Sequence, residues 1–196
     1  KKLYGRDNHV IKLREAYGRV ASASAQSSNR QQSEAVIVSG DAGAGKSLLV
    51  EMGLREYVVK TKEGFFVSGK YCQLQSRSPY AAIVESFTDL VDLIVQEGGE
   101  ALLKVREAMK RELGPNTKIM VSLIPNLSRL TGEEYHHTIG LQGGKLFFLF
   151  KRLCRAFLRA VSMSGHPIVM LIDDIQWAER QSLEVLEAIL SDPDSR

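Results

Sequence analysis

Cysteine is scarce in this chain of 196 residues, which contains only Cys72 and Cys154. The two are far apart, and neither has a second cysteine at the short spacing that metal-binding pairs require. The sequence therefore contains no cysteine-based metal motif. We interpret both side chains as inert thiols, which is typical of proteins from a reducing compartment, and expect an intracellular, cytoplasmic location.

Long apolar runs and a strong charge of either sign are also missing. No segment is apolar enough over sufficient length to cross a bilayer, and no secretory signal pattern is present. Lysine and arginine number 26 against 23 aspartates and glutamates, a net charge of only +3. Dedicated nucleic-acid binders usually carry a larger basic excess. We therefore expect no membrane contact, and no nucleic-acid contact within this segment.

The length and composition suit one substantial core, because 44% of the residues are hydrophobic and 25% are charged. The chain starts with Lys1 and stops at "SDPDSR", directly after a helical pattern. We expect residues 1–196 to be the N-terminal portion of one domain in a longer protein.

A glycine-rich turn between two apolar runs is the most informative stretch. Ala35–Ser39 is rich in β-branched residues, which predicts a strand, and Ser47–Tyr57 has the apolar spacing of a helix. The turn between them matches G-x-x-x-x-G-K-[ST], a loop whose backbone N–H groups surround a phosphate. The helix N-terminus adds partial positive charge there. In this pattern Lys46 reaches the β- and γ-phosphates and Ser47 ligates magnesium. The predicted nucleotide-binding residues here are Gly40, Asp41, Ala42, Gly43, Ala44, Gly45, Lys46, Ser47 and Leu48.

Two aspartates end a second apolar run, "IVMLIDD", at Asp173 and Asp174. The run predicts a central parallel strand buried on both faces, and ligands bind at the carboxyl ends of such strands. We expect Asp173 to be a magnesium ligand and Asp174 to orient or deprotonate the attacking water. With Lys46, Asp174 completes the predicted catalytic pair. The alternative is that both aspartates only cap the next helix.

The remaining patterns are mainly helical. We predict a helix within residues 1–20 capped by Asp7 or Asn8, a flexible Ser- and Gln-rich connection over residues 21–34, and a strand at Phe65–Lys70. Residues 79–162 read as a mainly helical insertion between two strands, with helices at 79–95, 101–113, 119–130 (broken at Pro125) and 141–162. The basic side of the last helix fits a solvated face better than a site for an acidic partner; its members are Lys151, Arg152, Arg155 and Arg159.

Four stretches together resemble the nucleotide-binding part of AAA-type and STAND-type signalling ATPases, in the origin-recognition-complex-like group. They are "LYGRD", "VSGDAGAGKS" (Walker A), "FFVSGKYCQLQSRSPYAAIVESF" and "IVMLIDDIQWAERQSLEVLEAIL" (containing Walker B). The third looks most like the ATPase module of large hybrid sensor and serine/threonine kinases.

The resemblance implies a site near the adenine at Tyr4, Gly5 and Arg6. Asp7 and Cys72 depart from the family, which commonly has glutamate at the first position and an acidic residue at the second. Within "QWA", Trp177 is expected to have a packing role, and Gln176 has no assigned role.

The fold implied is α/β: a P-loop NTPase three-layer sandwich with a parallel sheet, truncated before the sensor strand, the fifth strand and the lid. The function implied is an ATP-binding, magnesium-dependent ATPase module that serves as a nucleotide-driven switch in a signalling protein. Alternatives are a module that holds nucleotide with negligible hydrolysis and a DNA-associated ATPase of the origin-recognition or transcription-regulator type. Expected partners are ATP or ADP, other domains of the same polypeptide (kinase, sensor or repeat domains), and a second copy in nucleotide-dependent self-association.

Overall fold

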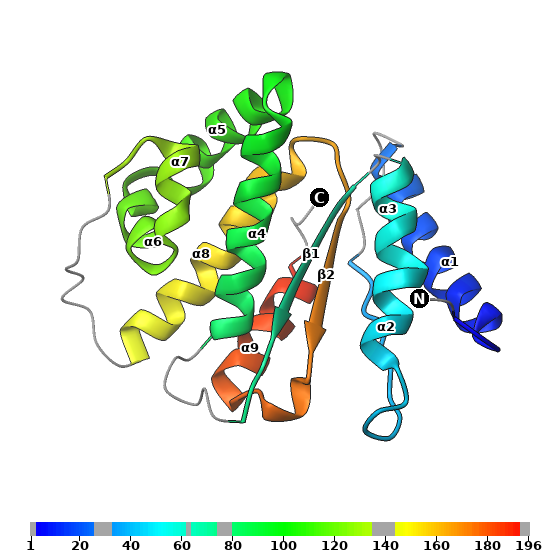
Figure 1. The fold of residues 1–196 in the computed structure, drawn as a ribbon. Helices are drawn as coiled ribbons and strands as arrows, with labels where there is room; N and C mark the ends of the chain where they lie inside the picture. Colours follow the sequence, from blue (N-terminus) through cyan, green and yellow to red (C-terminus); the bar gives the residue numbers. More distant parts are fainter. Residues whose placement is uncertain (1–2, 26–32, 62–63, 74–79, 135–143, 193–196) are drawn as a thin grey trace.

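Two parallel strands form the centre of the structure. The computed structural model describes residues 3–25, 33–61, 64–73, 80–134 and 144–192. Strand β1 (Phe65–Lys70) pairs with β2 (Ile168–Asp173), so that the two strands end level with each other. Helices cover both faces of this sheet in Figure 1, with α1 to α3 on one side and α4 to α9 on the other. The predicted three-layer α/β arrangement is confirmed.

The helices follow the predicted order, with shifted ends. Those before β1 are α1 (Asp7–Ala25), α2 (Lys46–Val50), a π-helical turn η1 (Glu51–Arg55) and α3 (Glu56–Thr61). Between the strands lie α4 (Ala81–Glu97), α5 (Gly99–Leu113), η2 (Gly114–Asn116), α6 (Thr117–Leu123), η3 (Pro125–Leu127), α7 (Ser128–Thr131) and α8 (Gly144–Ser162). After β2 come η4 (Ile175–Trp177) and α9 (Arg180–Leu190).

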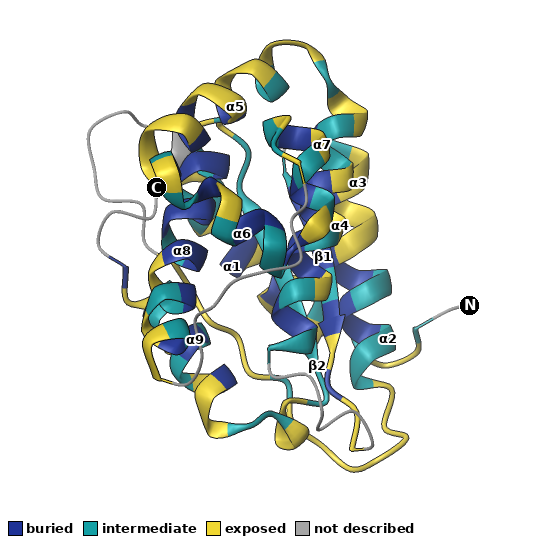
Figure 2. Cartoon of the chain, turned by 90° about the vertical axis from the view of Figure 1, so that its left-hand side faces the viewer, coloured by how far each residue is buried: buried dark blue, intermediate teal, exposed yellow. Residues whose placement is uncertain are grey.

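Alternation along the strands divides the interior into two cores. Successive strand residues point to opposite faces. Phe65 and Val67 therefore join a large core with α4, α5 and α8, whereas Phe66 joins a smaller one with α1 and the helical segment after the glycine-rich loop. In Figure 2 the buried residues lie where helices face the sheet or one another. The glycine-rich loop is thus anchored through the smaller core.

The predicted strand at Ala35–Ser39 is wrong. These residues form no strand, and Val36 and Ile37 are 52% and 89% exposed. A β-branched run becomes a strand only where a neighbouring strand supplies ladder hydrogen bonds. In the described part of the chain, β2 pairs with β1 alone. For the same reason β2 is not buried on both faces as predicted, and its six residues are all half-buried.

Two expectations about the N-terminal segment also change. Helix α1 begins at Asp7 itself, and the carbonyl oxygen of Arg6 accepts hydrogen bonds from the N–H groups of His9 and Val10. Arg6 therefore directly precedes the helix, and neither Asp7 nor Asn8 occupies the capping position. The helix continues to Ala25, into the predicted flexible connection, and residues 26–32 lie outside the described residues.

The basic side of α8 is not simply solvated. Arg155 donates to Asp192 at 3.0 Å, and Arg159 lies 3.6 Å from the other oxygen of that carboxylate. The Asp192 side chain is only 1% exposed. These arginines therefore join α8 to the end of α9 through a buried carboxylate, which was not foreseen from sequence.

Among the described helices, none combines the length and the apolar character needed to span a membrane.

Candidate functional site

The glycine-rich loop lies at the carboxyl end of the two strands (Figure 1). Gly43 and Gly45 have φ angles of 78° and 79°, in the left-handed region that L side chains rarely adopt. A Cβ atom at either glycine would meet nothing within 4 Å, so the backbone conformation, not crowding, requires glycine there. Helix α2 begins directly after this turn at Lys46.

Lys46 lies folded across the loop. Its ammonium donates to the carbonyl oxygens of Gly40 and Asp41, each at 2.9 Å. Two of the predicted loop residues therefore hold the lysine by their backbone in this structure. The same ammonium is available to an incoming anion once these two hydrogen bonds are exchanged.

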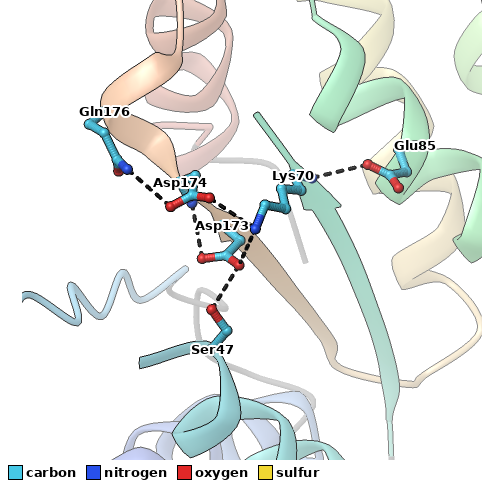
Figure 3. A network of polar contacts seen from close by, with 6 residues as sticks. All are labelled: Ser47, Lys70, Glu85, Asp173, Asp174 and Gln176. Atoms are coloured by element: carbon cyan, nitrogen blue, oxygen red, sulfur yellow. Dashed lines mark hydrogen bonds and ion pairs between the residues drawn. The ribbon is translucent and has the colours of Figure 1, made fainter. Parts of the chain in front are cut away.

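Ser47 and Asp173 are in direct contact, although 126 residues separate them along the chain. The Ser47 hydroxyl donates to Oδ2 of Asp173 at 2.8 Å, as Figure 3 shows. Both predicted magnesium ligands thus come together where α2 begins and β2 ends. A hydroxyl and a carboxylate oxygen are the hard ligands that magnesium prefers.

Asp174 has a left-handed backbone conformation with φ of 52°, which aspartate tolerates better than most residues. One oxygen of its carboxylate accepts from the Gln176 amide at 3.0 Å, and the other lies 2.9 Å from the Lys70 ammonium. The hydrogen bond from Lys70, and after it that from Gln176, lowers the pKa of Asp174.

Lys70 is a member of this site that sequence reasoning missed. It is the last residue of β1, and its ammonium is 2.9 Å from Asp174 and 3.6 Å from Asp173. Its backbone N–H donates to the carboxylate of Glu85 on α4 at 3.0 Å (Figure 3). The hydrogen bond to Asp174 raises the pKa of Lys70. The sequence did contain a signal for Lys70: it ends one predicted strand and Asp173 ends the other, and parallel neighbouring strands that end in register bring their last residues together.

These groups line one cleft of about 630 Å³, which is within the range of small-molecule sites. The lining residues are Ile37, Val38, Ser39, Gly40, Ala42, Gly43, Gly45, Lys46, Ser47, Leu48, Lys70, Asp173, Asp174, Ile175 and Gln176.

The adenine contact implied for Tyr4, Gly5 and Arg6 stays a prediction. Tyr4, Gly5 and Arg6 are not among the residues that line the cleft. Arg6 donates to the carbonyl of Ala44 at 3.0 Å, so this segment contacts the glycine-rich loop. Trp177 is 45% exposed, and its packing role stays a prediction.

Comparison with known proteins gives a family match and a similar protein. The family model described as "AAA ATPase domain" matches residues 2–196. A "Hybrid signal transduction histidine kinase G" from Dictyostelium discoideum is 30% identical over 157 residues, which cover 80% of this chain. The matched part is only 4% of that much longer relative. No solved structure gives a significant match.

Proposed function

Because the chain belongs to the AAA ATPase domain family, we propose that Gly40–Leu48 binds the phosphates of ATP or ADP, with magnesium held beside Ser47 and Asp173. The observation that carries this proposal is the Ser47–Asp173 hydrogen bond. It joins the start of the helix after the loop to the end of β2, where a phosphate-bound cation needs oxygen ligands.

The Ser47 hydroxyl and the Asp173 carboxylate suit magnesium better than a metal ion whose ligands all come from the protein. The described residues contain no group of three or more His, Cys, Asp or Glu side chains arranged to hold a metal ion. Magnesium commonly takes only one or two protein ligands and completes its shell with phosphate oxygens and water. When bound, it would neutralise charge on the β- and γ-phosphates.

In the proposed complex, Lys46 exchanges its two loop carbonyls for phosphate oxygens. This exchange favours binding, because the ammonium attracts a charged phosphate oxygen more strongly than a neutral carbonyl oxygen. The N–H groups of the loop and of the first turn of α2 add further donors at the same end of the helix.

Hydrolysis would depend on Asp174. Its carboxylate is held by Lys70 and Gln176, whose hydrogen bonds lower its pKa and make it a weaker base, while each oxygen keeps a lone pair that can accept from a water molecule. That engagement also favours a second candidate, a module that holds nucleotide with negligible turnover.

A switch role in signalling is the broader proposal. Its support is the similarity to a protein named as a hybrid signal transduction histidine kinase. In this proposal nucleotide binding and release change contacts with kinase, sensor or repeat domains of the same polypeptide, or with a second copy, in the cytoplasm.

The decisive experiment is titration calorimetry of ATP with magnesium on the wild-type protein, Lys46→Ala and a control, Lys60→Ala. Lys60 pairs with Glu56 on α3, its side chain is 77% exposed, and it is not among the residues that line the cleft. We expect Lys46→Ala to lose most of the affinity and Lys60→Ala to keep it. Equal affinity in all three proteins would refute phosphate binding by this loop.

A further inference from the structure

Lys70 brings a second cation to the cleft, opposite the loop that carries Lys46. Among the described lining residues, the charged side chains are Lys46, Lys70, Asp173 and Asp174, so two positive and two negative charges balance. Without Lys70 the same set would carry a net negative charge next to the proposed magnesium position.

The ammonium of Lys70 also lies close to the carboxylate oxygen of Asp173 that contacts Ser47, and Asp173 and Ser47 are the two residues that would hold the metal. Oδ2 of Asp173 accepts the Ser47 hydroxyl at 2.8 Å and lies 3.6 Å from the Lys70 nitrogen. Lys70 therefore neutralises the carboxylate at the point where a divalent cation would have to bind.

We propose that Lys70 takes the place of the divalent cation while nucleotide is absent, so that the metal binds firmly only together with ATP or ADP. This inference rests on the proposed function of the site and adds to it an order of binding. The nucleotide phosphates would supply further oxygen ligands for the metal. They would also give the Lys70 ammonium a new anion to pair with in place of the two aspartates.

The ammonium of Lys70 can change position while the main chain of the residue stays fixed. The strand pairing with β2 and the hydrogen bond to Glu85 hold its main chain. Its side chain is 55% exposed, and a lysine carries its charge on a flexible four-carbon stem. The ammonium can therefore leave the two aspartates without disturbing the packing of the sheet.

The test is binding of Mn²⁺, a spectroscopic substitute for magnesium, followed by electron paramagnetic resonance in the absence of nucleotide. We would compare the wild-type protein with Lys70→Gln, the charge-retaining Lys70→Arg and the remote control Lys60→Gln. Removing two exposed ion pairs should raise the Mn²⁺ affinity of Lys70→Gln about three- to tenfold. Lys70→Arg and Lys60→Gln should stay close to wild type.

A second readout is the ratio of Mn²⁺ affinities with and without saturating ADP, which should be larger in wild type than in Lys70→Gln. Lys70→Met, which keeps the apolar stem, replaces Lys70→Gln if thermal melting shows that the glutamine variant is unfolded. Unchanged Mn²⁺ affinity in a folded, neutral Lys70 variant overturns the inference. Failure of wild-type protein to bind ATP in calorimetry refutes the proposed function instead, so the two failures are distinguishable.

Discussion

Gly69 in β1 is the position where the structure predicts the largest effect of a single added methyl group. A Cβ atom there would lie 1.9 Å from the carbonyl oxygen of Ala82 and 2.6 Å from the hydroxyl of Ser86. Both atoms belong to α4, which rests directly on the strand at this glycine. Restoring an ordinary contact of 3.4 Å requires helix and strand to separate by about 1.5 Å.

The separation is costly because α4 supplies much of the larger core. Six of its apolar side chains are fully buried, namely Ala82, Ile83, Phe87, Leu90, Val91 and Ile94. Extra methyl groups in packed cores typically cost about 1–3 kcal/mol. The obstacle at Gly69 is helix backbone, not a flexible side chain, so we expect Gly69→Ala to lower the free energy of unfolding by about 3 kcal/mol. The change also displaces the end of β1 that positions Lys70, and should weaken ATP binding.

Urea denaturation followed by circular dichroism measures the first effect. The matched control is Gly18→Ala in α1, where an added Cβ atom meets nothing within 4 Å. Alanine in a helix interior is favoured over glycine, so the control should gain about 0.5–1 kcal/mol. A Gly69→Ala protein within about 0.5 kcal/mol of wild type, the usual range of neutral surface substitutions, would contradict the close packing of α4 on β1.

Two further predictions concern carboxylates. Asp192→Asn should lower the free energy of unfolding by about 2 kcal/mol, less than the loss of a fully buried pair, because Arg155 is 35% exposed. The control Glu56→Gln, in an exposed helix pair, should cost less than about 0.5 kcal/mol. Equal midpoints of the two variants in urea denaturation would refute the buried role of Asp192. Asp173→Ala should weaken magnesium-dependent ATP binding in calorimetry, whereas Asp174→Asn should keep binding and lower ATP turnover in a phosphate-release assay, because a metal ligand acts already on the bound ground state. Equal loss of binding in both variants would show that the division of roles is wrong.

Local patterns in the sequence determined much of this protein. The glycine spacing before Lys46 specifies a turn with positive φ angles, and those angles depend on the glycines themselves, not on distant partners. The pattern of β1 predicts its observed ends, Phe65–Lys70, because the segment opens with two phenylalanines and a valine, which favour strands. The resemblance to AAA-type ATPases is confirmed by the family match.

Long-range pairing decided the rest. Ala35–Ser39 has the composition of a strand but forms none, since a strand needs a partner that its own residues cannot specify. The contacts of Lys70 with Asp174 and of Arg155 with Asp192 join residues far apart in the chain. No local propensity encodes such a pair, because its energy depends on the distance, burial and charge of groups that only the packed helices and strands bring together.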